Sequence, residues 1–225
     1  MNPSNPTPPG KAKRRLLLWG AIAAIIGSAL RIYYVQFAAP EVNLELHQAV
    51  GRVMAEETVH LVGHNGKVVI VTVNLSGAPE LKVQVDAFEK HLKLLGGVSV
   101  KEKVVLDPGD NLKYRPGAGL SAKHFLKIAR KSAGADALVS FVGAPQLSDA
   151  EFQQMKSVPK FIAETHSPEK LGNLFQKKLL LVAIVPRYDF PAPGPRKPQT
   201  GRQWFDRYFQ IVVPDSPLPV EEATP

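Results

Sequence analysis

Seven small or polar residues stand where chemistry could occur, because each closes or follows a run expected to form a strand. They are Asn74, Ser76, Gly77, Gly143, Ala144, Thr165 and His166. The runs are 67–74, 137–142 and 160–165. In open parallel sheets, ligands bind beyond the carboxyl ends of the strands, where the strand order reverses. The seven residues are therefore candidates for ligand binding, and the alternative is that they only cap helices and turn the chain.

Catalytic motifs are missing from the sequence. No Gly-x-Gly-x-x-Gly follows the first run, and neither a Walker loop nor Gly-x-Ser-x-Gly occurs. His60 and His64 have the i, i+4 spacing of a helical metal site, but no acidic neighbour completes a ligand set and Gly63 interrupts the helix. His166 and Ser167 are adjacent, and adjacent side chains rarely point together. We therefore predict no enzymatic activity, no metal site and no cofactor.

Aromatic side chains concentrate near the C-terminus. Trp204, Phe205 and Tyr208 lie close to Arg202 and Arg207. Exposed aromatic and arginine side chains of this kind are typical of protein interfaces, so these residues are a candidate partner-binding patch. The alternative is that they pack the last elements of the chain onto the sheet.

Helical and strand patterns alternate from residue 41 to residue 213. Apolar residues recur at helical spacing in 41–62 and 79–95, although 59–73 could instead form a hairpin that turns at Asn65-Gly66. Strands are expected at 67–74, 98–106, 137–142, 160–165, 178–185 and, as a sixth edge strand, up to Val213. Strands that alternate with helices pair in parallel through right-handed crossovers. We therefore predict an α/β fold, a doubly wound, flavodoxin-like, mostly parallel sheet of 5-6 strands with the order 2-1-3-4-5.

Charge and cysteine content exclude several classes of function. The formal net charge is +8, but five of the cations precede residue 40, and residues 40–225 carry 23 basic against 20 acidic side chains. A net charge of +3 on the folded part argues against a nucleic-acid partner. Because the chain has no cysteine, disulfides, thiolate metal sites and lipid attachment to cysteine are excluded.

The N-terminal region has the pattern of a membrane anchor. Residues 1–15 are proline-rich and then basic, which indicates a disordered cytoplasmic leader. Residues 16–38 are predicted to form a single transmembrane helix, with Arg31 near its far end, and a cleaved signal peptide is the alternative. The cations before the helix favour a cytoplasmic N-terminus. This pattern predicts a protein of the bacterial inner membrane with its C-terminal domain in the periplasm.

The rest of the chain is divided by composition. The extracytoplasmic α/β domain is expected over 41–213, with a proline-rich excursion at 186–201. The segment 214–225 is expected to be a disordered tail.

Residues 64–190 resemble one lobe of the type I periplasmic-binding-protein fold, in particular the substrate-binding proteins of ABC transporters. The resemblance rests on Ala135-Asp-Ala-Leu-Val-Ser-Phe-Val-Gly-Ala-Pro145, Val158-Pro-Lys-Phe-Ile162 and Gly66-Lys-Val-Val-Ile-Val-Thr-Val73. It implies an α/β lobe that binds a small molecule at its strand ends. Ala144 stands where such proteins often have a hydroxyl, and no second lobe is recognisable.

Two functions follow from these features. The first is a single-pass envelope protein whose α/β domain binds a partner protein, or weakly a small ligand. The alternative is a solute-binding component of an ABC-type uptake system that acts as a homodimer, each copy supplying the second lobe for the other.

Overall fold

A computed structural model describes residues 11–37, 43–106, 119–155, 158–187 and 198–216. The chain divides into two compact units, Met1–Glu41 and Val42–Pro225. Most of the predicted leader, part of the proline-rich excursion and most of the C-terminal tail lie outside the described residues.

The first unit contains one helix, α1, Lys11–Phe37. In the part of the chain that the structure describes, no helix is long and apolar enough to cross a membrane. The transmembrane helix predicted for 16–38 is therefore not confirmed.

The second unit is built around a six-stranded sheet with the order β2-β1-β3-β4-β5-β6. Its strands are β1 Gly66–Val73, β2 Val98–Leu106, β3 Ala137–Ser140, β4 Lys160–Glu164, β5 Leu180–Pro186 and β6 Phe209–Val212. The first five strands pair in parallel, and β6 pairs with β5 antiparallel. The α/β class and the predicted order 2-1-3-4-5 are confirmed, and the full order differs by the antiparallel strand added at the β5 edge.

Helices and short 3-10 turns connect the strands. They are α2 Leu44–Val62, η1 Leu75–Gly77, α3 Pro79–Leu95, α4 Ala122–Lys131, α5 Asp149–Gln153, η2 Pro168–Lys170, α6 Gly172–Gln176 and α7 Gly201–Tyr208. Asn43 caps α2 by accepting a hydrogen bond from the Leu46 amide at 3.1 Å. Because α2 is one continuous helix that ends before β1, the hairpin alternative for 59–73 is wrong.

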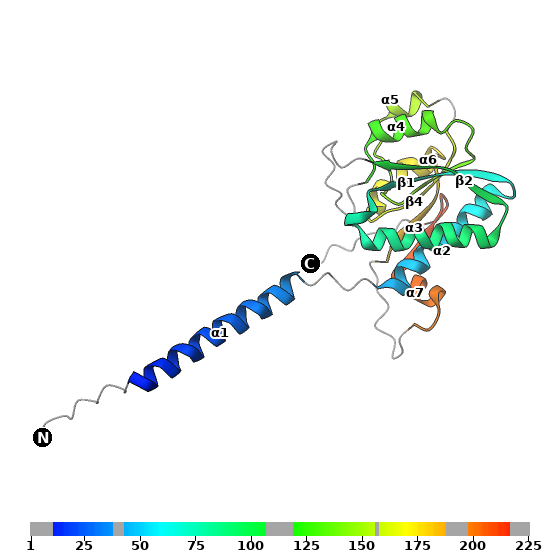
Figure 1. Ribbon diagram of the computed structural model, residues 1–225. Coiled ribbons are helices and arrows are strands. Elements are labelled where there is room, and N and C mark those ends of the chain that lie inside the picture. Colours follow the sequence, from blue (N-terminus) through cyan, green and yellow to red (C-terminus); the bar gives the residue numbers. More distant parts are fainter. Residues whose placement is uncertain (1–10, 38–42, 107–118, 156–157, 188–197, 217–225) are drawn as a thin grey trace, which may run out of the picture. The chain divides into compact units, whose positions relative to one another are not determined.

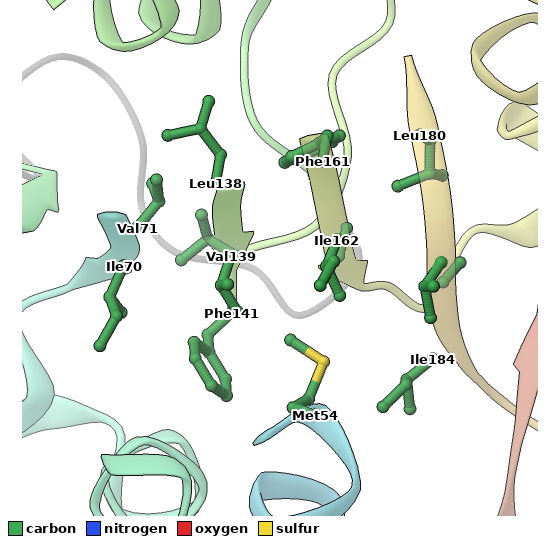
Figure 2. Close-up of a cluster of buried hydrophobic side chains, with 14 of the residues drawn as sticks. Met54, Ile70, Val71, Leu138, Val139, Phe141, Phe161, Ile162, Leu180 and Ile184 are labelled. Atoms are coloured by element: carbon green, nitrogen blue, oxygen red, sulfur yellow. The ribbon is translucent and has the colours of Figure 1, made fainter. Parts of the chain in front are cut away.

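The helices cover both faces of the sheet. Figure 1 shows α4 and α5 over one face and α2, α3 and α7 over the other. Phe125 on α4 packs against Phe161 with ring centroids 5.1 Å apart, and Phe88 on α3 packs edge-on against Phe141 at 5.4 Å. In Figure 2 the Phe141 side chain points to the side of the sheet on which Met54 of α2 lies. We call the side of the sheet that carries α2, α3 and α7 the α2 face.

Candidate functional site

The loop after β1 is held by its own side chains. Asn74 Oδ1 accepts a hydrogen bond from the Ser76 amide at 3.1 Å and one from the Ser76 hydroxyl at 2.8 Å. Asn74 thereby caps η1, while Asn74, Ser76 and Gly77 are all exposed at the carboxyl end of β1. The capping role is present in the structure, and ligand binding by these three residues stays a prediction.

The loop after β3 is fixed by a buried hydroxyl and by glycine packing. Ser140 Oγ donates to the Gly143 carbonyl at 2.7 Å and accepts from the Val142 amide at 3.3 Å. Gly143 has a φ of +93°, and a β-carbon there would lie 2.8 Å from Gly119 Cα. Ala144 is half-buried in the same loop. The approach of Gly119 explains why glycine stands at 143, because a side chain there would collide with the Gly119 backbone.

The end of β4 carries the chemistry that our sequence reading missed. Glu164 and Thr165 are both 3 % exposed. Glu164 is paired in register with Ile184 of β5, and paired residues of parallel strands share a face. Figure 2 shows that Ile184 points to the α2 face. Glu164 therefore directs a carboxyl group to the α2 face, into the layer between β4 and α2.

The Glu164 carboxyl lacks the partners that a buried charge needs. Its Oε1 atom makes no hydrogen bond, and the closest ionisable atom given for it is His166 Nδ1 at 3.5 Å, which is too long for a good bond. Burial raises the pKa of Glu164 from 4.5 to about 8. Glu164 is therefore mostly protonated and neutral at pH 7.

His166 lies on the solvent side of Glu164. Its side chain is 44 % exposed, against 4 % for the Glu164 side chain. Burial lowers the pKa of the His166 imidazole, and the nearby His47 lowers it further. Thr165, between the two site residues, is used structurally, because its amide donates to the Ile184 carbonyl at 2.9 Å and its hydroxyl accepts from the Ser167 amide at 3.3 Å.

The first turns of α2 and α3 complete the site. His47 Nδ1 on α2 lies 3.2 Å from Gln84 Nε2 on α3. Gln84 is 4 % exposed, and its Oε1 atom has no hydrogen-bond partner. Burial lowers the pKa of His47, and the Glu80 carboxylate opposes this shift. Both helices begin at the carboxyl edge of the sheet, because α2 runs back along β1 and α3 follows β1 directly.

We call His47, Gln84, Glu164 and His166 the carboxyl-edge cluster. Contacts and electrostatic interactions link its members in the order Gln84, His47, His166, Glu164. Among the described residues, Gln84 Oε1 and Glu164 Oε1 are the buried side-chain atoms left without a hydrogen-bond partner, and both belong to this cluster. Such atoms are rare because burying an unpaired acceptor costs about 1–3 kcal/mol. The arrangement offers two unsatisfied buried oxygens, of which Gln84 Oε1 can accept a hydrogen bond and the neutral Glu164 carboxyl group can donate or accept one.

Other predicted groups lie elsewhere. Trp204 and Phe205 are 7 % and 1 % exposed, and Trp204 stacks on Tyr208 with centroids 5.9 Å apart. Their burial agrees with the packing alternative rather than with an exposed partner patch. In the described ranges, no group of three or more His, Asp or Glu side chains is placed to hold a metal ion.

A groove with a volume of about 510 Å³ runs between α2 and α3. Arg52, Lys90 and Leu94 are among its lining residues, and it shares none with the carboxyl-edge cluster.

Comparisons with known proteins bear on the fold. No protein-family model and no curated protein matches the chain. AraP, an arabinose-binding protein from Geobacillus stearothermophilus, matches 77 % of this chain and 62 % of its own, with 13 % identity and a TM-score of 0.50. The XylFII-LytSN complex matches 77 % of this chain and 60 % of its own, with 15 % identity and a TM-score of 0.50.

A further similar structure is an ABC-transporter solute-binding protein from Burkholderia graminis C4D1M in complex with D-arabinose. It covers 65 % of this chain and 48 % of its own, with 20 % identity and a TM-score of 0.47. The chain therefore spans about half to three-fifths of the length of these solved structures. The resemblance to one lobe of the type I periplasmic-binding-protein fold is confirmed at the level of the fold.

Proposed function

We propose that the α/β domain is a small-molecule binding module whose ligand binds at the carboxyl edge of the sheet, next to the carboxyl-edge cluster. The observation that carries this proposal is the buried Glu164 Oε1, which has no hydrogen-bond partner. A buried polar atom of this kind destabilises the domain unless something supplies a hydrogen-bond partner. Strand ends are also where open parallel sheets bind ligands.

The similar solved structures support the same reading. AraP is an arabinose-binding protein, and the Burkholderia graminis protein was crystallised with D-arabinose. At 13–20 % identity the likeness supports the fold, so solute binding by this chain is our proposal. In this reading the chain acts outside the cytoplasm as the solute-binding component of an uptake system.

A homodimer is part of the proposal. A type I binding protein encloses its ligand between two lobes, and this chain matches about half to three-fifths of the solved structures. We propose that a second copy faces the carboxyl edge and covers the ligand. Equilibrium sedimentation of the full chain with and without ligand tests this point, and a strict monomer in both conditions contradicts it.

A second candidate function is recognition of a partner protein. It is favoured by the likeness to XylFII, whose solved structure is a complex with LytSN. In this second candidate function, the α/β domain is the interaction domain that the sequence predicts. Cross-linking of the full chain in envelope extracts, followed by identification of one partner in stoichiometric amount, would support it.

Thermal shift of the full chain against a panel of neutral, anionic and cationic solutes tests small-molecule binding. A ligand at one hundred times its Kd should raise Tm by roughly 5–10 °C for a chain of this size. Glu57→Gln on α2 is the matched control, since Glu57 lies almost three helical turns from His47 and should not affect the shift. The proposal is wrong if no solute of any class shifts Tm.

A further inference from the structure

The carboxyl-edge cluster contains no lysine or arginine. The Glu80 carboxylate, in the first turn of α3, acts on His47, and Glu164 lies beneath His166. Within the described ranges, neither Glu80 nor Glu164 forms an ion pair with a lysine or arginine. Most other ion pairs on this domain join a carboxylate to a lysine or arginine, as in Lys103–Glu89 at 2.6 Å. The cluster therefore holds no lysine or arginine charge, and the Glu80 carboxylate acts on it.

The cluster has two buried oxygens without a partner. Gln84 Oε1 is an acceptor, Glu164 Oε1 is an acceptor only once the carboxyl group ionises, and both side chains are more than nine-tenths buried. The amide nitrogen of Gln84 is already directed at His47 Nδ1. A partner that brings hydrogen-bond donors together with a positive charge suits the ionised form of this cluster.

We infer that this edge binds a small organic cation, with an ammonium group seated against the Glu164 carboxyl group. This inference rests on the proposed binding function and names the class of its ligand. An ammonium group offers three donors and no acceptor, so it can pair with the ionised Glu164 carboxylate. A hydroxyl also brings lone pairs, and it cannot neutralise a buried carboxylate. A metal ion is disfavoured because the described residues hold no suitable ligand set.

Binding couples to the loss of one proton. Without ligand, burial raises the pKa of Glu164 to about 8, so the carboxyl group keeps its proton at pH 7. A bound ammonium favours the carboxylate, and the carboxyl proton leaves to the solvent while the ligand keeps its own. The charged and titratable groups that face Glu164 are His166 after β4, His47 on α2 and, through His47, Glu80 on α3. The half-exposed His166 side chain moves aside to admit the ligand.

Titration calorimetry of the full chain at pH 7 tests this inference. The probes are 1,4-diaminobutane, the neutral 1,4-butanediol with the same carbon frame, and D-arabinose. The diamine should bind at least tenfold more tightly than the diol. Runs in two buffers with different ionisation enthalpies should show the release of about 0.9 proton per ligand, as expected for a carboxyl group with a pKa near 8.

Two variants locate the proton. Glu164→Gln should abolish proton release and weaken diamine binding at least tenfold, whereas Glu57→Gln should leave both unchanged. Circular dichroism checks that the variants fold. If Glu164→Gln does not fold, the buffer dependence measured on the wild type alone shows whether a proton is released on binding.

The outcomes separate the two proposals. If D-arabinose or the diol binds as tightly as the diamine and no proton is released, the cation inference is overturned and small-molecule binding stands. If Glu164→Gln binds the diamine as tightly as the wild type does, the diamine does not bind at Glu164 and the proposed position of the site is wrong. If no solute of the panel binds, both proposals fail.

Discussion

Gly51 of α2 lies directly against the backbone carbonyl of Gln84 on α3, so no side chain fits at position 51. A β-carbon there would overlap the Gln84 carbonyl oxygen and lie 2.9 Å from Ala87 Cβ. The contact sets how close α2 comes to α3. It thereby also sets the 3.2 Å separation of His47 Nδ1 and Gln84 Nε2 one turn further toward the edge of the sheet.

Gly51→Ala should therefore lower the free energy of unfolding by roughly 1–3 kcal/mol, because the added methyl group forces two packed helices apart. Urea denaturation of the full chain measures this change. Gly77→Ala is the control, since no atom lies within 4 Å of a β-carbon at that exposed position. Equal stability of the two variants would show that the helices separate without cost.

Glu164 should make the domain less stable as the pH rises. Its pKa is about 8 in the folded state and 4.5 when unperturbed, so between these values the folded state binds more protons than the unfolded state. The stability that the protonated Glu164 contributes is therefore complete below pH 4.5 and is lost as the pH rises to 8. The loss in the free energy of unfolding is at most roughly 5 kcal/mol. Glu164→Gln should flatten this dependence in urea denaturation from pH 6 to pH 9. If the free energy of unfolding of this variant falls with pH as steeply as that of the wild type, Glu164 is not the source of the pH dependence.

The two histidines should act in the opposite direction at acid pH. Burial lowers the pKa of His47 and of His166 below the ordinary 6.5, so the unfolded state takes up protons first as the pH falls. Their contribution to stability is complete above pH 6.5 and is lost below it. Thermal unfolding between pH 7.5 and 5.5 in the Glu164→Gln background isolates this effect. Adding His47→Gln and His166→Asn should remove the loss of stability at low pH. If stability still falls as steeply toward pH 5.5 in this variant, the two histidines are not the cause.

Ser140→Ala should lower the free energy of unfolding by about 1–3 kcal/mol, because it leaves the Gly143 carbonyl and the Val142 amide without the partners that they have in the buried loop. Ser99→Ala serves as the control, because Ser99 is exposed and its hydroxyl bond to Gly66 is a long 3.4 Å. Chemical denaturation of both variants measures the difference. A neutral Ser140→Ala would mean that water replaces the hydroxyl.

Local patterns account for what the sequence predicted well. The β-branched run 67–73 can only be a buried strand, and β1 is found at Gly66–Val73. Val98–Leu106 was predicted with its bounds because the glycines before it end a helix, and its charged centre suits the edge position that it holds. The alternation of elements then fixed a parallel order, which the antiparallel β6 extends.

The site was harder to predict, because it depends on what covers each residue. The rule for strand ends pointed to Thr165 and His166, but Glu164 looked like the polar end of a strand and not like a buried acid. It lies on the face of the sheet that α2 covers, and His47 on that helix precedes it by more than a hundred residues. A glutamate that closes the apolar run 161–163 was the signal that could have been used.

The central position of β1 also has a consequence for folding. β1 pairs with β2 on one side and with β3 on the other, and its Lys67 amide donates to Asp136 Oδ2 at 2.7 Å across 69 residues of chain. Contacts between segments so far apart in sequence form slowly, because a long loop must close first. The α2–β1–α3–β2 segment can assemble early, whereas Glu164 and His166 join His47 only after β3 and β4 have docked. Refolding should therefore restore the helical signal before it completes the carboxyl-edge cluster.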